Sequence, residues 1–229
     1  INRVSAWIIK QYGPKAVIQL ARQMGITSPL PEYPSICLGT PEITLLEMVG
    51  AMNTFPNKGT YIMPECILRI EDRSGRVIYQ SETRSSEVMD ESKAYTMVQL
   101  MRGVVDIGTG TRIRYKYHLS NEIAGKTGTT QRNSDGWFIG YTPELTAGVW
   151  VGGEERSVHF NSTAEGQGAS MALPVWALFF SKIYKDPLLK ITPNGFIKPS
   201  RLDPNLDMDC SDYSEELENN EQSQSDLFF

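Results

Sequence analysis

Three short segments, residues 122–129, 136–141 and 145–151, follow one another with only brief turns between them. The turns contain asparagine, serine, aspartate and proline, which favour a reversal of the chain. Strands joined by such short connections run antiparallel, because a parallel pair needs a crossover of a dozen or more residues. The sequence therefore predicts an antiparallel sheet in the second half of the chain.

Helices are predicted before and after this sheet. Apolar residues at helical spacing occupy residues 4–9 and 17–24, and Gly13-Pro14 between them indicates a helical hairpin. A longer helix is expected over residues 90–105, and the apolar run 172–180, too short to span a membrane, predicts a buried helix. The expected fold class is α+β, a mixed α/β arrangement in which helices flank an antiparallel sheet.

Three local signals complete this outline. Thr40-Pro41-Glu42 predicts the start of a helix with an apolar stripe, and residues 66–70 and 76–80 flank a turn that predicts a β-hairpin. The glycine-rich run 166–170 lacks the lysine and hydroxyl ending of a phosphate-binding loop. We interpret that run as a turn that packs closely against its neighbours.

The composition excludes several functions. The 229 residues are 40% hydrophobic and 21% charged, as in ordinary soluble proteins, and the net charge of −5 with no basic cluster argues against a nucleic-acid partner. Cys37, Cys66 and Cys210 lack metal-ligand spacing, so neither a metal nor a cofactor is expected. Residues 196–229 are acidic and polar, which predicts a disordered tail after a folded unit of residues 1–195, with a partner-binding tail as the alternative.

The run Gly125-Lys126-Thr127-Gly128-Thr129-Thr130 is the strongest chemical signal. Lysine supplies a positive charge, threonine hydroxyls donate to an anion, and Gly128 lets a ligand approach the main chain. On a strand, Lys126 and Thr127 point to opposite faces, so both can serve one site only along an exposed edge, where the Thr129 N–H could stabilise an oxyanion. These groups suit acyl transfer on a substrate that carries a free carboxylate. The same residue types also occur in ordinary solvated turns.

The surrounding residues resemble those of a known family. The motif, then Asn133-Ser134-Asp135-Gly136-Trp137, and Gly148-Val149-Trp150-Val151-Gly152, are similar to the third-motif region of penicillin-binding proteins. Gly108-Thr109-Gly110 before the sheet and Ala172-Leu173-Pro174-Val175-Trp176 after it favour the class A, bifunctional members. The resemblance runs to about Tyr184, and it implies that residues 1–195 are the C-terminal portion of a penicillin-binding protein/β-lactamase-like transpeptidase domain, incomplete at its N-terminus.

Two of the family's three motifs are not complete in these residues. No Ser-x-x-Lys stands in a suitable place, so the nucleophilic serine is expected upstream, in a longer protein of which this chain is a part. Asn2 could be the asparagine of Ser-x-Asn, or an ordinary helix cap. By resemblance, Lys126 and Asn2 are the candidate catalytic residues, and Thr127, Gly128 and Thr129 bind the substrate carboxylate.

The resemblance also implies the activity and its setting. The parent protein is expected to be a peptidoglycan D,D-transpeptidase with an upstream glycosyltransferase domain, while these residues alone are expected to be inactive. Its implied partners are stem peptides ending in D-alanyl-D-alanine, lipid-linked precursors and β-lactam antibiotics. The implied location is the extracytoplasmic, periplasmic face of the bacterial cytoplasmic membrane, with anchoring by an N-terminal segment outside these residues. A β-lactamase or D,D-carboxypeptidase fragment, or a non-catalytic binding module, are the alternatives.

Overall fold

The computed structural model describes residues 2–204. The predicted acidic tail begins at residue 196, so most of it, together with Cys210, lies outside the described residues. Cys37 and Cys66 are free thiols. Among the described residues, no helix is long and apolar enough to cross a membrane.

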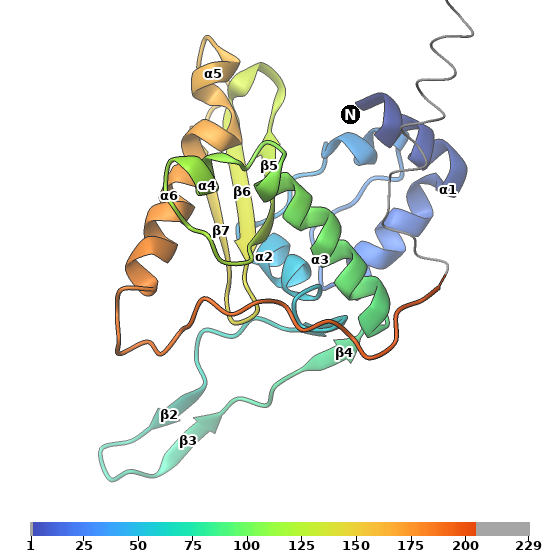
Figure 1. Ribbon diagram of the computed structural model, residues 1–229. Helices are drawn as coiled ribbons and strands as arrows, with labels where there is room; N and C mark the ends of the chain where they lie inside the picture. Colours follow the sequence, from blue (N-terminus) through green and yellow to red (C-terminus); the bar gives the residue numbers. More distant parts are fainter. Residues whose placement is uncertain (1, 205–229) are drawn as a thin grey trace, which may run out of the picture.

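The predicted antiparallel sheet is confirmed. Its strands are β5 (Ala124–Thr129), β6 (Asp135–Tyr141) and β7 (Thr146–Gly152), in the order β5-β6-β7 (Figure 1). The register pairs Thr127 with Phe138, and Phe138 with Val149. A short 3-10 helix, η2 (Gln131–Asn133), forms the turn between β5 and β6.

One face of the sheet is covered by α6 (Gly168–Ile183), which follows the short α5 (Thr163–Gly166). This is the predicted buried helix of residues 172–180. Trp176 is fully buried, stacks on Phe180 at a centroid distance of 3.9 Å and meets the edge of Phe138 at 5.3 Å. Its indole N–H donates to the carbonyls of Gly140 and Ala147, so the largest core side chain leaves no buried donor unpaired.

The opposite face packs against α2 (Leu45–Asn53) and α3 (Glu91–Asp106). Ala124 and Tyr141 of the sheet are fully buried on this face. They form a second apolar cluster with the buried side chains of Val98 and Met101 of α3. The inward residues of α3 are those that the sequence predicts, because they recur at helical spacing and Asp90 caps the helix. In Figure 1 the sheet lies between α6 on one side and α2, α3 and α1 on the other.

The N-terminal helix α1 (Asn2–Gln23) changes direction at Gly13, whose φ of 74° and ψ of 158° are not helical. The sequence predicts a break at this point, but the two helical segments meet at a single residue instead of forming a hairpin with a loop. Only glycine adopts this backbone conformation without strain, and Pro14 then starts the second segment. The 3-10 helix η1 (Pro34–Leu38) contacts α1.

The predicted start of α2 is wrong. The helix begins at Leu45, and Thr44 is its cap: the Thr44 hydroxyl accepts the Glu47 N–H while the Glu47 carboxylate accepts the Thr44 N–H. This reciprocal pair satisfies two backbone donors, which Thr40 followed by Pro41 does not do.

The remaining strands form two small ribbons. β1 (Thr60–Ile62) pairs with β4 (Ser85–Glu87), and β2 (Arg69–Glu71) pairs with β3 (Val77–Gln80), both antiparallel. The second ribbon is the hairpin that the sequence predicts, and it projects away from the rest of the molecule (Figure 1). A one-turn helix, α4 (Arg112–Tyr115), follows α3.

Candidate active-site edge

The strand that carries the motif lies at an edge of its sheet. Within the described residues, β5 pairs with β6 only, so its other side is not covered by a strand. Lys126 pairs with Ile139, and Ala124 on the same face packs against α3. Thr127 pairs with Phe138, which packs against α6. Lys126 and Thr127 therefore lie on opposite faces of an edge strand, as the alternation of side chains predicts.

The hydrogen bonds of the ladder decide which backbone groups reach the free edge. The Thr130 N–H donates to the Asp135 carbonyl at 3.2 Å, just beyond the paired strands. Hydrogen-bonded and non-hydrogen-bonded pairs alternate along an antiparallel ladder. Thr130 belongs to a hydrogen-bonded pair. Thr129 and Thr127, one and three positions before it, therefore belong to non-hydrogen-bonded pairs, and their N–H groups point away from β6, toward the free edge.

Lys126 is exposed, and its ammonium group donates to the Thr127 carbonyl at 2.6 Å. The surrounding protein nevertheless removes part of its hydration, and this desolvation lowers the pKa of Lys126. A lysine whose neutral form becomes accessible at a lower pH than usual is better suited to exchange protons with a neighbouring hydroxyl.

The two motif threonines have different partners. The Thr129 hydroxyl oxygen accepts the N–H of Gly168 at the start of α6, at 3.1 Å, so its own O–H remains available to donate. The Thr127 and Thr109 hydroxyl oxygens lie 2.6 Å apart. Thr109 was not among the predicted site residues, although it stands between two glycines in a segment that supports the family resemblance.

Gly168 explains how α6 reaches the motif. A Cβ at this position would lie 2.3 Å from the carbonyl oxygens of both Gly128 and Trp137, so only glycine lets the helix approach the ends of β5 and β6. The predicted close packing of residues 166–170 is confirmed, but the run is not a turn: Gly166 ends α5, and α6 begins at Gly168 after the single residue Gln167. The contact also fixes the N–H that Thr129 accepts.

Asn2 begins α1 and is exposed, and no hydrogen bond within the described residues joins it to Lys126. The helix that carries Asn2 lies on the same side of the sheet as α3 (Figure 1), and the face of β5 that bears Ala124 and Lys126 is also the one that packs against α3. The role of Asn2 therefore stays a prediction.

Among residues 2–204, no three His, Cys, Asp or Glu side chains gather in an arrangement that could hold a metal ion.

Comparison with known families supplies the assignment. Residues 33–173 match the family model of the penicillin-binding protein transpeptidase domain, which is more than half of the chain. The chain belongs to this family. The matched range contains the whole of β5 and the start of α6, and therefore both hydroxyl contacts of the penicillin-binding protein motif.

Curated relatives include penicillin-binding protein 2D of Bacillus subtilis, 34% identical over 82% of this chain and 26% of the relative. Penicillin-binding protein 1A of Aquifex aeolicus is 30% identical over 86% of this chain and 27% of its own length. The resemblance to class A proteins is thus confirmed. The chain spans about a quarter of the length of these relatives.

Solved structures confirm the fold class. Penicillin-binding protein 1A from Haemophilus influenzae has a TM-score of 0.73 at 18% identity, covering 89% of this chain and 34% of that one. PonA1 from Mycobacterium tuberculosis in complex with penicillin V has a TM-score of 0.67 at 22% identity, covering 82% and 54%. The chain therefore has the fold of penicillin-binding protein transpeptidase domains.

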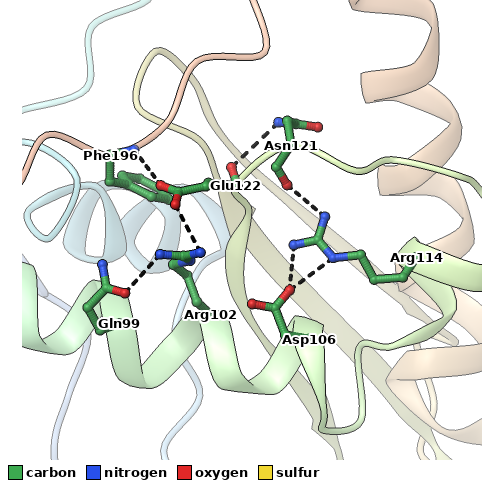
Figure 2. Close-up of polar contacts among 7 residues, drawn as sticks. All are labelled: Gln99, Arg102, Asp106, Arg114, Asn121, Glu122 and Phe196. Atoms are coloured by element: carbon green, nitrogen blue, oxygen red, sulfur yellow. Dashed lines mark hydrogen bonds and ion pairs between the residues drawn. The ribbon is translucent and has the colours of Figure 1, made fainter. Parts of the chain in front are cut away.

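A polar network fixes the start of β5 in this penicillin-binding protein (Figure 2). The Arg102 guanidinium on α3 pairs with Glu122 at 2.9 Å, and Glu122 accepts the Phe196 N–H at 2.7 Å. Arg114 donates to Asp106 and to the carbonyls of Leu119 and Asn121. The network ties α3, α4 and the C-terminal segment to the residues immediately before the motif strand.

Proposed function

We propose that this chain supplies the third-motif side of the active site of a peptidoglycan D,D-transpeptidase, which cross-links D-alanyl-D-alanine stem peptides by serine acyl transfer. The observation that carries the proposal is the edge strand β5. It presents a lysine on one face, two threonines on the other, and the Thr129 N–H along the free edge.

The proposed roles follow from these contacts. The Thr129 O–H donates to the substrate carboxylate, because its oxygen already accepts the Gly168 N–H. The Thr129 N–H forms half of the oxyanion hole, and the nucleophile's own N–H forms the other half; a donor of this kind typically stabilises the transition state by about 3 kcal/mol. Lys126, with its lowered pKa, exchanges protons with the serine of the second motif.

The remaining parts of the site are assigned to the longer parent protein. The chain has no suitable Ser-x-x-Lys and covers about a quarter of its relatives' length, so we assign the nucleophilic serine to the part that it does not cover. Asn2 then completes Ser-x-Asn at the start of α1. The glycosyltransferase domain, the binding of lipid-linked precursors, the membrane anchor and the periplasmic location belong to the parent in this proposal.

The test is labelling of the parent protein by a fluorescent penicillin. The wild type should form a covalent adduct, and Lys126→Ala should reduce its formation by at least about a hundredfold, since the variant loses a proton-transfer group. Lys182→Ala, which removes an exposed lysine from α6, is the matched control and should label normally.

Two results would contradict the proposal. Absence of labelling in the folded wild-type parent would favour a non-catalytic binding module. Undiminished labelling of Lys126→Ala would refute the role of the lysine. The 229-residue chain by itself should not be labelled, because none of its serines stands in a Ser-x-x-Lys motif.

A further inference from the structure

Thr109 lies in the connection between α3 and α4, where it stands between two glycines that pack against the last turn of α3. The Gly110 N–H donates to the Val104 carbonyl at 2.8 Å. A Cβ at Gly108 would lie 2.9 Å from the Val104 Cα, and one at Gly110 would lie 3.0 Å from the Val104 carbonyl oxygen. The glycines therefore allow a tight approach that holds the loop against α3.

The other end of this loop is also anchored. Arg112, the first residue of α4, donates to the Ser170 hydroxyl at 2.9 Å and to the Ala169 carbonyl at 3.2 Å, both in the first turn of α6. The loop is thus bonded to α3 on one side and to α6 on the other. Its single exposed hydroxyl, that of Thr109, is held at a fixed place beside β5.

A bound anion determines which hydroxyl donates in the hydrogen bond between Thr109 and Thr127. Either hydroxyl could be the donor across the 2.6 Å contact between Thr109 and Thr127. If Thr127 donates its proton to a carboxylate, it can only accept from Thr109, since a hydroxyl has one proton. The result is a chain in which the Thr109 O–H donates to Thr127 and the Thr127 O–H donates to the anion, and each bond in such a chain strengthens the next.

We propose that Thr109 is a positioning residue for carboxylate recognition, which orients the Thr127 hydroxyl and polarises it toward the substrate. The inference rests on the proposed transpeptidase function and adds to it a residue outside the third motif. Thr109 itself does not touch the substrate carboxylate in this arrangement. Its effect should therefore depend on whether the ligand carries that carboxylate.

The test compares acylation of the parent protein by benzylpenicillin and by its methyl ester, which lacks the negative charge, at millimolar concentration by intact-protein mass spectrometry. Thr109→Val should lower the second-order rate constant for benzylpenicillin about five- to tenfold, the value of one hydrogen bond. The rate for the ester should stay within about twofold, because no carboxylate is oriented. Thr109→Ser keeps the hydroxyl and should restore the rate for benzylpenicillin.

Thr111→Val is the matched control, since Thr111 lies in the same loop and its side chain does not cap α4; it should behave as the wild type. Three results would overturn the inference: an unchanged rate in Thr109→Val, equal slowing with the acid and the ester, or no rescue by Thr109→Ser. Equal slowing would indicate a structural role only. A wild-type parent that reacts with neither compound would instead overturn the transpeptidase proposal, and this inference with it.

Discussion

The Arg102 guanidinium lies 2.9 Å from the Glu122 carboxylate and so joins the middle of α3 to a residue two positions before the motif strand. The side chains of Arg102 and Glu122 are 25% and 34% exposed, so water screens the pair only in part. Glu122 also accepts the Phe196 N–H, and the buried Arg102 Nε has no hydrogen-bond partner within residues 2–204. If the charge of Glu122 is removed, the Arg102 guanidinium keeps the neutral Gln99 oxygen as an acceptor at 2.9 Å but loses the counter-charge at this position.

Glu122→Gln should lower the free energy of unfolding of the 229-residue chain by about 1–3 kcal/mol, because a partly buried guanidinium loses its counter-charge. Denaturant titration at pH 7 measures the change. Glu42→Gln is the control: its pair with Arg156 is highly exposed, and the expected change is below about 0.5 kcal/mol. Equal losses in the two variants would show that the Glu122 pair contributes nothing beyond a surface contact.

Phe196 tests the predicted domain boundary at residue 195. Its ring meets Tyr141 edge-on at 6.1 Å, and its N–H is bonded to Glu122. A chain that ends after residue 195 should therefore unfold about 2–4 kcal/mol more easily than one that ends after residue 204, from the loss of an aromatic contact and a charge-assisted hydrogen bond. If thermal or denaturant unfolding places the two truncations at the same stability, the boundary at residue 195 is correct as predicted.

Glu47 joins α2 to the loop after α1 by accepting hydrogen bonds from Ser28, Thr27 and Thr44. The side chains of Ser28 and then Thr27 are the main reason that the pKa of Glu47 lies well below its ordinary value. At pH 7, Glu47→Gln should cost about 1–3 kcal/mol of unfolding free energy, since the bonds are charge-assisted.

The pH dependence of this loss has a defined sign. A depressed carboxyl pKa stabilises the folded state above the unfolded pKa of about 4.3, and this contribution disappears as the pH falls through the lower folded pKa. The stability difference between wild type and Glu47→Gln should therefore be constant from pH 7 to about 5 and shrink below about pH 4. A difference that grows on acidification would contradict the assigned contacts.

Gly168→Ala and Gly103→Ala form a matched pair with opposite expected signs. A Cβ at Gly168 would lie 2.3 Å from two carbonyl oxygens of the sheet, so α6 must shift, and we expect a loss of about 2–4 kcal/mol. At Gly103, inside α3, nothing lies within 4 Å, and alanine should stabilise the chain by about 0.4–1 kcal/mol. Thermal unfolding measures both, and a tolerated Gly168→Ala would show that the approach of α6 is not close.

Most of the sheet and its two long covering helices could be predicted from local patterns. Short turns impose antiparallel pairing on residues 122–151, and the 3.6-residue spacing of Ala94, Val98, Met101 and Val105 marks the buried side of α3. The start of α2 could not be predicted in this way. Thr40 and Thr44 are both plausible caps by residue type, and the decision depends on Glu47, which also bonds to Thr27 and Ser28, twenty and nineteen residues earlier.

The sequence by itself determined the motif strand, the opposite faces of Lys126 and Thr127 and the family resemblance, because these depend on residue order and the two-residue period of a strand. Only the tertiary structure decided that β5 is an edge, that Thr109 meets Thr127, and that Phe196 packs over the start of β5. The contacts of Thr109 and Phe196 join residues that are distant along the chain. The edge position of β5 depends on there being no second strand beside it among the described residues. Local propensity carries no information about such contacts, since packing of the whole domain brings them together.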